Sequence, residues 1–419
     1  MVLSKKILNF IIFIAFSTAV YFLIIKQIIY PTIIPMVIKG GASIFTDWTA
    51  ILNANMCDEK GYDVFVENPC DQWKRIHVYG KALLYLPFIR SFPKFYFLIT
   101  PILMNLLFIF TVISSLFIYE DKNRFFLLSF FIISIPVLLV VERSNIDLAI
   151  FITMYILAKN NNIILKHLFL LLATIIKFYP IVLSIVFLFE KNFKKIGINL
   201  LIFFSITILI FLFQADTLIK IFNNQGVASA SSFGIYEFSF MGFVNLLRYL
   251  DISIYNSNYN MIKYLYVFLC ILLPITLTFF YLSKKHYTND LLVNLYKKNT
   301  FENKFYILSS FIILICYFSF SNFIYREIFF LGLIPWILKS EKKIKSNNFL
   351  TFYFYILFFK FFITTILVFL SRNKIFPNLD FIFIIIKHSI DLYLISVILY
   401  IFLFSTLILI KKITPTIFN

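Results

Sequence analysis

The sequence predicts an all-α polytopic membrane protein, a bundle of about twelve transmembrane helices. Three observations predict this class. Hydrophobic residues make up 61% of the 419-residue chain, whereas soluble proteins are roughly half apolar. Apolar runs of about 20 residues, the length that crosses a bilayer core, recur along the sequence. Strands of about 10 residues with alternating polarity, the pattern of a membrane β-barrel, do not occur in it.

The first apolar run, at about residues 7–29, follows Lys5 and Lys6. We interpret it as a retained first span. The stretch from Ile7 to Ile25 is longer than the core of a signal peptide, and no small-x-small cleavage site follows it. Basic residues favour the cytoplasmic side of a membrane, so the N-terminus is expected to be cytoplasmic.

Later apolar runs predict the other spans, and the basic clusters between them place the C-terminus in the cytoplasm as well. Two short runs are tilted crossings or a re-entrant hairpin, broken near Pro180, because proline lacks an amide donor and disfavours helix before it. FSNFIYRE, at 320–327, is expected to turn at the outer surface. The expected spans are about 94–118, 125–141, 146–158, the short pair 163–176 and 180–189, 196–213, 261–283, 305–320, 323–338, 349–370 and a last one that ends before Lys411.

The formal charge of +18 is explained by this loop bias, so no nucleic-acid partner is expected. The predicted localisation is the cell inner (plasma) membrane, where the chain makes multiple passes among membrane lipids. Residues 1–419 are expected to form a single transmembrane domain with two polar outer segments, 31–93 and 214–260. Lipid cannot satisfy the backbone groups of such loops, so they must lie in water or over a water-filled cavity. Short juxtamembrane helices are expected in the first of them.

The first outer loop carries the residues that suggest chemistry. Asp47 follows GGASIFT, directly after the first span, where a carboxylate could act as a general base on a hydroxyl. The alternative is an ordinary solvated loop acid. Cys57 and Cys70 are disulfide candidates if the outer side is oxidising, with free thiols as the alternative. A zinc site would need more ligands than this pair and the nearby His77 supply.

Cations at the outer ends of spans suggest a site for an anionic head group. Arg143, after the third predicted span, could hold a phosphate with its fork of donors. The alternative is a local ion pair with Glu142 or Asp147. Lys177 interrupts the short pair, and Arg326 marks another outer turn. The alternative for all three is snorkelling toward lipid phosphates.

The Walker, dinucleotide-binding, HExxH and GxSxG patterns are absent from the sequence. Their absence argues against nucleotide-driven transport and against the common soluble hydrolases. A lipid-borne substrate would require none of these motifs.

The order of the polar motifs resembles the integral-membrane GT-C glycosyltransferases, in the branch of polyprenyl-phosphate-mannose-dependent α-mannosyltransferase-like proteins. Asp47 matches the acid that follows the first span in that branch. GYDVF at 61–65 is similar to its G-x-x-x-Y-like turn, and HVYG and LPF, within 77–88, are similar to the Tyr-Pro segment. ERSN at 142–145 is similar to the Arg-Gly-Gln-x-Asn segment, and KFYP at 177–180 to the Lys-x-x-Pro segment.

This resemblance covers roughly the first 200 residues. The chain departs from the pattern at Phe65, where Tyr is usual, and at Gly80, where Pro is usual. It also departs at Ser144, which replaces the Gln-containing part of the Arg-Gly-Gln-x-Asn segment. These departures leave the sugar and the donor type open.

The resemblance implies a GT-C-like bundle that transfers a sugar from a polyprenyl-phosphate donor to a lipid or glycan acceptor on the extracytoplasmic face. Asp47 would be the general base, with Asp63 as the fallback. No cofactor is identified, and a divalent metal is left open. The residues expected at the donor phosphate are Arg143, Lys177 and Arg326, and those expected in the substrate cavity are Asn145, Tyr179, His77 and Tyr79.

Two other classes compete with the transferase. An envelope polysaccharide polymerase or ligase would carry arginines in a large central outer loop, but residues 214–260 contain only Arg248. A lipid-linked sugar flippase or other transporter would show charged residues in mid-span and paired repeats. Neither feature is clear in the sequence.

Overall fold

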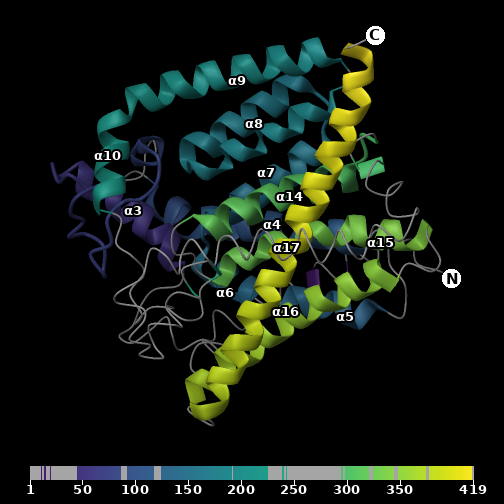
Figure 1. Cartoon of the computed structure of the whole chain (residues 1–419). Helices are drawn as coiled ribbons and strands as arrows, with labels where there is room; N and C mark the ends of the chain where they lie inside the picture. Colours follow the sequence, from purple (N-terminus) through teal and green to yellow (C-terminus); the bar gives the residue numbers. More distant parts are fainter. Residues whose placement is uncertain are drawn as a thin grey trace, which may run out of the picture. The chain divides into compact units, whose positions relative to one another are not determined.

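The computed structural model describes residues 45–85, 92–117, 124–190, 192–224, 298–319, 324–343, 348–373 and 377–417, with a few isolated positions besides. Within these ranges the chain forms helices and no strand (Figure 1). Two compact units are distinguished. The first comprises residues 1–227 and 368–375, and the second comprises residues 228–367 and 376–419.

Six helical stretches among the described residues are long and apolar enough to cross a membrane. Together with the all-helical secondary structure, they fit the predicted class of membrane-spanning helical protein. The predicted spans at 7–29 and 261–283 fall outside the described ranges, so the count of about twelve stays a prediction. The six stretches are Phe95–Leu116, Phe126–Arg143, Phe193–Phe213, Phe301–Phe318, Phe349–Val368 and Ile382–Leu403.

The first unit begins, among the long described ranges, with α3 (Thr46–Asp58), a helix inside the predicted first outer loop. Trp48, Ile51 and Leu52 lie on one face of α3, because residues three and four apart share a helix face, and they pack with Phe45. The Trp48 Nε1 donates a hydrogen bond to the Tyr96 carbonyl at 2.8 Å. This packing ties α3 to η2 (Phe95–Ile99), which leads into α4 (Thr100–Leu116).

The chain after α4 is broken twice by short turns. The first break, at Ser134, separates α5 (Phe125–Ile133) from α6 (Ile135–Arg143). The second break, at Ser144, separates α6 from α7 (Asp147–Lys159), and Ser144 adopts the left-handed conformation with φ 46°. The Ser144 hydroxyl donates to the Asn105 side chain of α4 at 3.2 Å, which holds this turn in place.

The predicted short pair is present as α8 (Ile163–Ile176) and η5 (Tyr179–Phe189), a 3₁₀ helix that begins with Tyr179 and Pro180. Asn162 caps α8 by accepting from the amide of Ile164 at 2.9 Å. In Figure 1, α8 lies beside α9 (Phe193–Phe213), and α10 (Ala215–Asn224) follows after a bend. η5, which begins within the KFYP break, packs against both α8 and α9.

Gly80 fixes the end of the first loop against α8. Its amide donates to the Ile176 carbonyl at 2.9 Å, and a Cβ there would overlap the Ile175 carbonyl oxygen. Only glycine allows this close backbone approach. It leads into η1 (Lys81–Leu84) and brings the loop to the chain break at Lys177.

Cys57 and Cys70 form a disulfide in the structure, with their Cα atoms 5.7 Å apart. This separation lies inside the ordinary range for a bridge. The bond closes the part of the first loop that contains GYDVF, so it ties the end of α3 to the segment that follows.

We expect Cys57→Ala with Cys70→Ala to lower the free energy of unfolding by about 3 kcal/mol, because a loop of this length gains entropy when it opens. Thermal unfolding in detergent, with and without reductant, measures this effect. Reductant should lower the melting temperature of the unsubstituted protein but not that of the double variant. Cys316→Ala, a buried site in the second unit, is the control, and equal melting temperatures in all three proteins contradict the expectation.

The second unit contains α14 (Phe301–Phe318), η7 (Ile324–Leu333), α15 (Ile334–Lys343), α16 (Asn348–Asn373) and α17 (Pro377–Ile417), with 368–373 counted in the first unit. The expected outer turn at 320–327 is wrong for its described part. Residues 324–327 begin the 3₁₀ helix η7, in which Tyr325 and Glu327 are buried. Gly332 lets η7 pack closely on Ser309 of α14.

Four charged side chains hold η7 to α16 and α17. Glu327 accepts from Lys360 at 2.7 Å, and Lys387 contacts Asp391 at 2.9 Å. Lys360 also pairs with Asp391, and Lys387 with Glu327. All four side chains have 0% exposure. The network is charge-balanced, which is what burial of ionised groups requires.

Candidate functional site

Asp47 lies in the first turn of α3, with 9% of its side chain exposed. Its Oδ1 accepts from Arg143 Nε at 3.1 Å and from Arg75 Nη1 at 3.0 Å. Its Oδ2 accepts from Asn145 Nδ2 at 2.7 Å. The structure thus joins three of the residues expected in the site, and Arg143 forms an ion pair with Asp47.

The turn between α6 and α7 aims Arg143 and Asn145 at the same carboxylate. The left-handed conformation of Ser144 reverses the chain between them. The Asn145 side chain also accepts from the Asp147 amide at 2.9 Å, so one amide group both starts α7 and binds Asp47. Residues with short polar side chains are suited to such local capping contacts.

Arg75 is a member of this site that sequence reasoning missed. It contacts Asp71 with Nε and Nη2, both at 3.0 Å, and its Nη2 also donates to the Thr46 carbonyl at 2.8 Å. Burial opposes its charge, but the hydrogen bond with Asp71 and the charges of Asp47 and Asp71 outweigh burial and raise the pKa of Arg75. The Asp71–Arg75 spacing in DQWKR was a visible signal, but it is also typical of an exposed local ion pair.

A second ion pair lies two residues from Asn145. The Asp147 carboxylate, fully buried, pairs with Lys177 and accepts from the Tyr179 hydroxyl at 2.6 Å. The Lys177 ammonium also lies 5.5 Å from the Tyr79 ring centre and 5.2 Å from that of Tyr179. The KFYP break and the HVYG segment therefore meet at one cation.

The Asp47 cluster and the Asp147–Lys177 pair are together charge-balanced in these contacts. Three carboxylates (Asp47, Asp71 and Asp147) face three cations (Arg75, Arg143 and Lys177). A carboxylate with a nearby hydroxyl can take a proton, and arginine and lysine can bind a phosphate. Both capacities are present here, in side chains of which Asp47, Arg143, Asp147 and Lys177 are buried and lie at helix ends, whereas Arg75 is partly exposed.

The remaining predicted residues lie elsewhere. Asp63, the fallback base, is a surface side chain whose Oδ2 accepts from Lys220 of α10 at 2.6 Å. Arg326 lies in η7, in the second unit. His77 is buried in the first loop, with its ring 5.4 Å from that of Phe65 and 5.6 Å from that of Tyr79.

Burial lowers the pKa of His77 to about 4 from its ordinary 6.5, although a hydrogen bond with the Gly80 backbone opposes the shift. The ring is therefore neutral in the folded chain near neutral pH. A neutral ring suits its position between two aromatic neighbours. His77 thus packs the loop that carries Arg75.

Acid is expected to destabilise this loop through His77. Between pH 6.5 and about 4 the unfolded chain binds a proton here that the folded chain does not, so stability is full above 6.5 and falls by about 3 kcal/mol as the pH drops to 4. Melting temperatures in detergent between pH 7.5 and 4 measure the loss. His77→Phe should flatten the acid side of this profile, and parallel profiles for the two proteins contradict the assignment.

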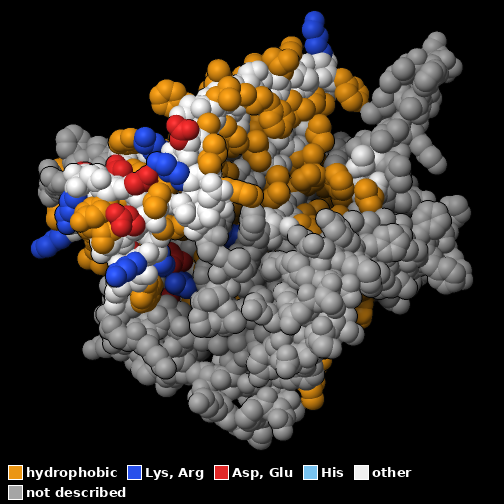
Figure 2. Space-filling view, turned by 60° about the vertical axis from the view of Figure 1, so that its left-hand side comes forward, with side chains coloured by type: hydrophobic (Ala, Val, Ile, Leu, Met, Phe, Trp, Pro, Cys, Tyr) orange, Lys and Arg blue, Asp and Glu red, His pale blue; other side chains and the backbone are white. Residues whose placement is uncertain are grey.

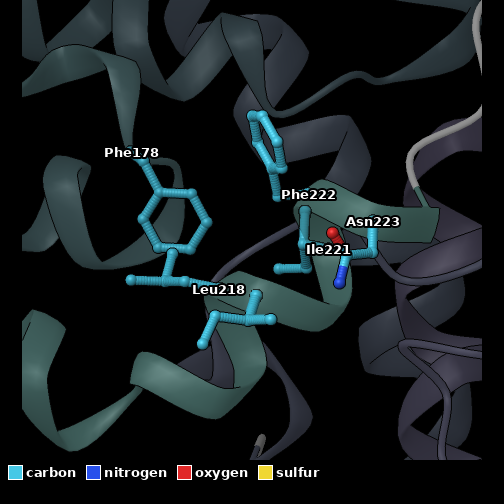
Figure 3. Close-up of a pocket in the computed structure, with 6 residues that line it drawn as sticks. Phe178, Leu218, Ile221, Phe222 and Asn223 are labelled. Atoms are coloured by element: carbon cyan, nitrogen blue, oxygen red, sulfur yellow. The ribbon is translucent and has the colours of Figure 1, made fainter.

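An apolar pocket of about 530 Å³ adjoins the KFYP break (Figure 3). Its walls are Phe178 and residues of α10: Leu218, Ile219, Ile221, Phe222 and Asn223. Phe178 stands between Lys177 and Tyr179, so the segment that binds Asp147 also supplies one wall. Ile219 and Phe222 are 58% and 68% exposed.

The surface near this pocket is strongly apolar. α9, which precedes α10, exposes a row of large hydrophobic side chains, including Leu201, Leu209 and Phe213. Figure 2 shows hydrophobic side chains covering a broad area of the described surface, with charged side chains gathered at one edge of it. Such a surface fits contact with lipid.

Metal ligands do not gather in the described part of the chain. No group of three or more His, Cys, Asp or Glu side chains there is placed to hold a metal ion.

Comparison with family models, with curated proteins and with solved structures finds no match for this chain.

Proposed function

We propose that the chain is a membrane glycosyltransferase that moves a sugar from a polyprenyl-phosphate donor to a lipid or glycan acceptor on the extracytoplasmic face. The observation that carries this proposal is the Asp47 carboxylate, which is buried and shared by Arg75, Arg143 and Asn145. A carboxylate, two guanidinium groups and an amide from three parts of the sequence thus meet, and this set would suit a base beside phosphate ligands. The resemblance to the GT-C pattern adds the reaction type.

In the proposed reaction Asp47 takes the proton of an acceptor hydroxyl. The hydroxyl oxygen attacks the anomeric carbon, and the bond from that carbon to the phosphate oxygen breaks. The polyprenyl phosphate leaves with the bonding electron pair. Arg143 and Lys177 would stabilise the negative charge that develops on the leaving phosphate.

A hydrocarbon-bearing donor suits the surroundings of the ion pairs. The apolar pocket at Phe178 lies one residue from Lys177 in the sequence, and the exposed side chains of α9 and α10 continue the apolar surface. A chain of isoprene units could lie on such a surface while its phosphate reaches the cations. Burial of apolar area would then contribute to donor affinity.

A transfer assay tests the proposal. Membranes from cells with and without the protein would be incubated with radiolabelled polyprenyl-phosphate sugars, and labelled lipid and glycan products would be separated. Label that reaches an acceptor only when the protein is present supports the proposal. Label that stays on the donor across the available sugars contradicts it.

The second unit provides one specific observation in favour of the transporter alternative. Lys360, Lys387 and Asp391 lie within the apolar stretches of α16 and α17, the mid-span charges that the sequence analysis did not identify. Ionisable groups at membrane depth often mark substrate or proton pathways. Movement of a lipid-linked sugar across proteoliposomes, without sugar transfer, would favour this function over the transferase.

A further inference from the structure

Arg75 is the most exposed member of the Asp47 network. Its side chain is 32% exposed, whereas those of Asp47, Arg143 and Asp71 are 9%, 8% and 2% exposed. A ligand that approaches Asp47 from water therefore meets the Arg75 guanidinium first. This makes Arg75 the accessible side of an otherwise buried site.

The guanidinium is held in place without using all of its donors. Asp71 takes Nε and one N–H of Nη2, the Thr46 carbonyl takes the other N–H of Nη2, and Asp47 takes one N–H of Nη1. Trp73 lies against the guanidinium, 4.5 Å from ring centre to Cζ. Four of the five N–H groups are thus engaged by described residues, which leaves one on Nη1 for a ligand.

Asp47 competes with any anion that binds at this donor. The network of Asp47, Asp71, Arg75 and Arg143 is neutral, with two charges of each sign. A phosphate at Nη1 would stand beside the Asp47 carboxylate, and like charges at that range repel. Binding would therefore be accompanied by release of Asp47 from Arg75.

We infer that Arg75 recognises the phosphate group of a lipid phosphate, and that Asp47 occupies this position as an internal competitor until the lipid binds. The identity of that lipid as a sugar donor rests on the proposed function. Donor binding would then free Asp47 to accept a proton from the second substrate. The order of binding, with the donor before the acceptor, follows from the same contact.

Trp73 supplies a binding signal that does not depend on catalysis. Its ring lies against Arg75 and is 37% exposed, so ligand at the guanidinium should change its fluorescence. Farnesyl phosphate would be titrated into the detergent-solubilised full chain, and the signal that disappears in Trp73→Phe would be assigned to this site. Farnesol and inorganic phosphate, the two parts of this ligand, would be titrated separately as controls.

Three variants separate recognition from a structural role. Arg75→Gln should weaken farnesyl phosphate binding by about ten-fold or more, which is the usual size of one charge-assisted contact. Asp47→Asn should strengthen it by about ten-fold, because the competing charge is removed while the side chain keeps its size. Asp63→Asn, a surface acid paired with Lys220, should leave the dissociation constant unchanged.

Either of two results overturns the inference. One is an Asp47→Asn affinity equal to or weaker than that of the unsubstituted protein. The other is a Trp73 signal that farnesol or inorganic phosphate reproduces at the same concentration as farnesyl phosphate. If Arg75→Gln does not fold, Arg75→Lys, which keeps the charge but not the fork, should show the same weakening.

Failure of the proposed function would look different from failure of this inference. Farnesyl phosphate binding that follows the predicted order of variants, with no sugar transfer in membranes, retains the phosphate site and removes the transferase. The opposite result is sugar transfer by the unsubstituted protein together with an unchanged affinity for farnesyl phosphate in both Arg75→Gln and Asp47→Asn. That result retains the transferase and removes the phosphate role of Arg75.

Discussion

Replacing Asp47 with asparagine is expected to lower sugar transfer by about 10²–10⁴-fold, which is the usual contribution of general base catalysis. Asparagine has nearly the same size and can still accept from Arg143 or Asn145 with its one carbonyl oxygen. It cannot take the proton of the acceptor hydroxyl. The rate of label transfer in membranes, normalised to the amount of inserted protein, measures the loss.

Asp63→Asn is the matched control, because it makes the same chemical change on a carboxylate that pairs with Lys220 at the surface. It should transfer sugar at the normal rate. Arg143→Ala should act differently and weaken donor binding, since its guanidinium is expected to contact the leaving phosphate. Near-normal transfer by Asp47→Asn would refute the base assignment even if the variant donor affinities behave as expected.

Local signals predicted the parts of the site but not their connections. Asp47, Arg143 and Asn145 could be chosen from polar positions at the ends of apolar runs. Their contact joins residues 96 and 98 positions apart, and it depends on how α3 packs against α4 and α6. That packing is a tertiary property, and no short pattern in the sequence encodes it.

Arg75 is a second residue whose tertiary contact a local sequence pattern does not reveal. Its local partner Asp71 is visible in the sequence, and such a pair is usually a solvated surface feature. Here the disulfide and the buried His77 fold the loop back, so the guanidinium also reaches Asp47. The loop closure turns a local ion pair into part of the site.

Element boundaries were predicted well where the chain carries a strong local signal. The bounds of α8 follow from the Asn162 cap and the KFYP break that ends with Pro180. The prediction was wrong at residues 324–327, where an acid and a tyrosine beside an arginine suggested an outer turn. Glu327 is instead buried because Lys360 and Thr364, from another helix, satisfy both of its oxygens.

Replacing Lys360 with methionine is expected to lower the free energy of unfolding by about 3–5 kcal/mol, the usual effect of removing one partner from a buried ion pair. The remaining members, Glu327, Asp391 and Lys387, would carry a net charge of −1 with no exposure to water. The Lys360 ammonium also lies 5.2 Å and 5.8 Å from the ring centres of Phe238 and Phe330. Methionine would fill much of that space, so the loss would arise from charge rather than from a cavity.

A second substitution tests whether the unpaired buried charge causes the loss of stability in Lys360→Met. Adding Glu327→Leu to Lys360→Met restores neutrality, because Lys387 and Asp391 still pair at 2.9 Å, and it should recover most of the lost stability. Melting temperature and the yield of monodisperse protein in detergent measure both variants. Lys339→Met is the control, since the Lys339–Glu302 pair is partly exposed and should cost about 1 kcal/mol or less.

The double variant also separates the two roles open to this network. If stability returns and sugar transfer is normal, the four charges serve to hold η7 against α16 and α17. If stability returns but substrate movement across a membrane is lost, the charges belong to a pathway, as the transporter alternative requires. If Lys360→Met unfolds at the same temperature as the unsubstituted protein, the ammonium is not the buried counter-charge of Glu327 and Asp391, and the expected cost of removing it is wrong.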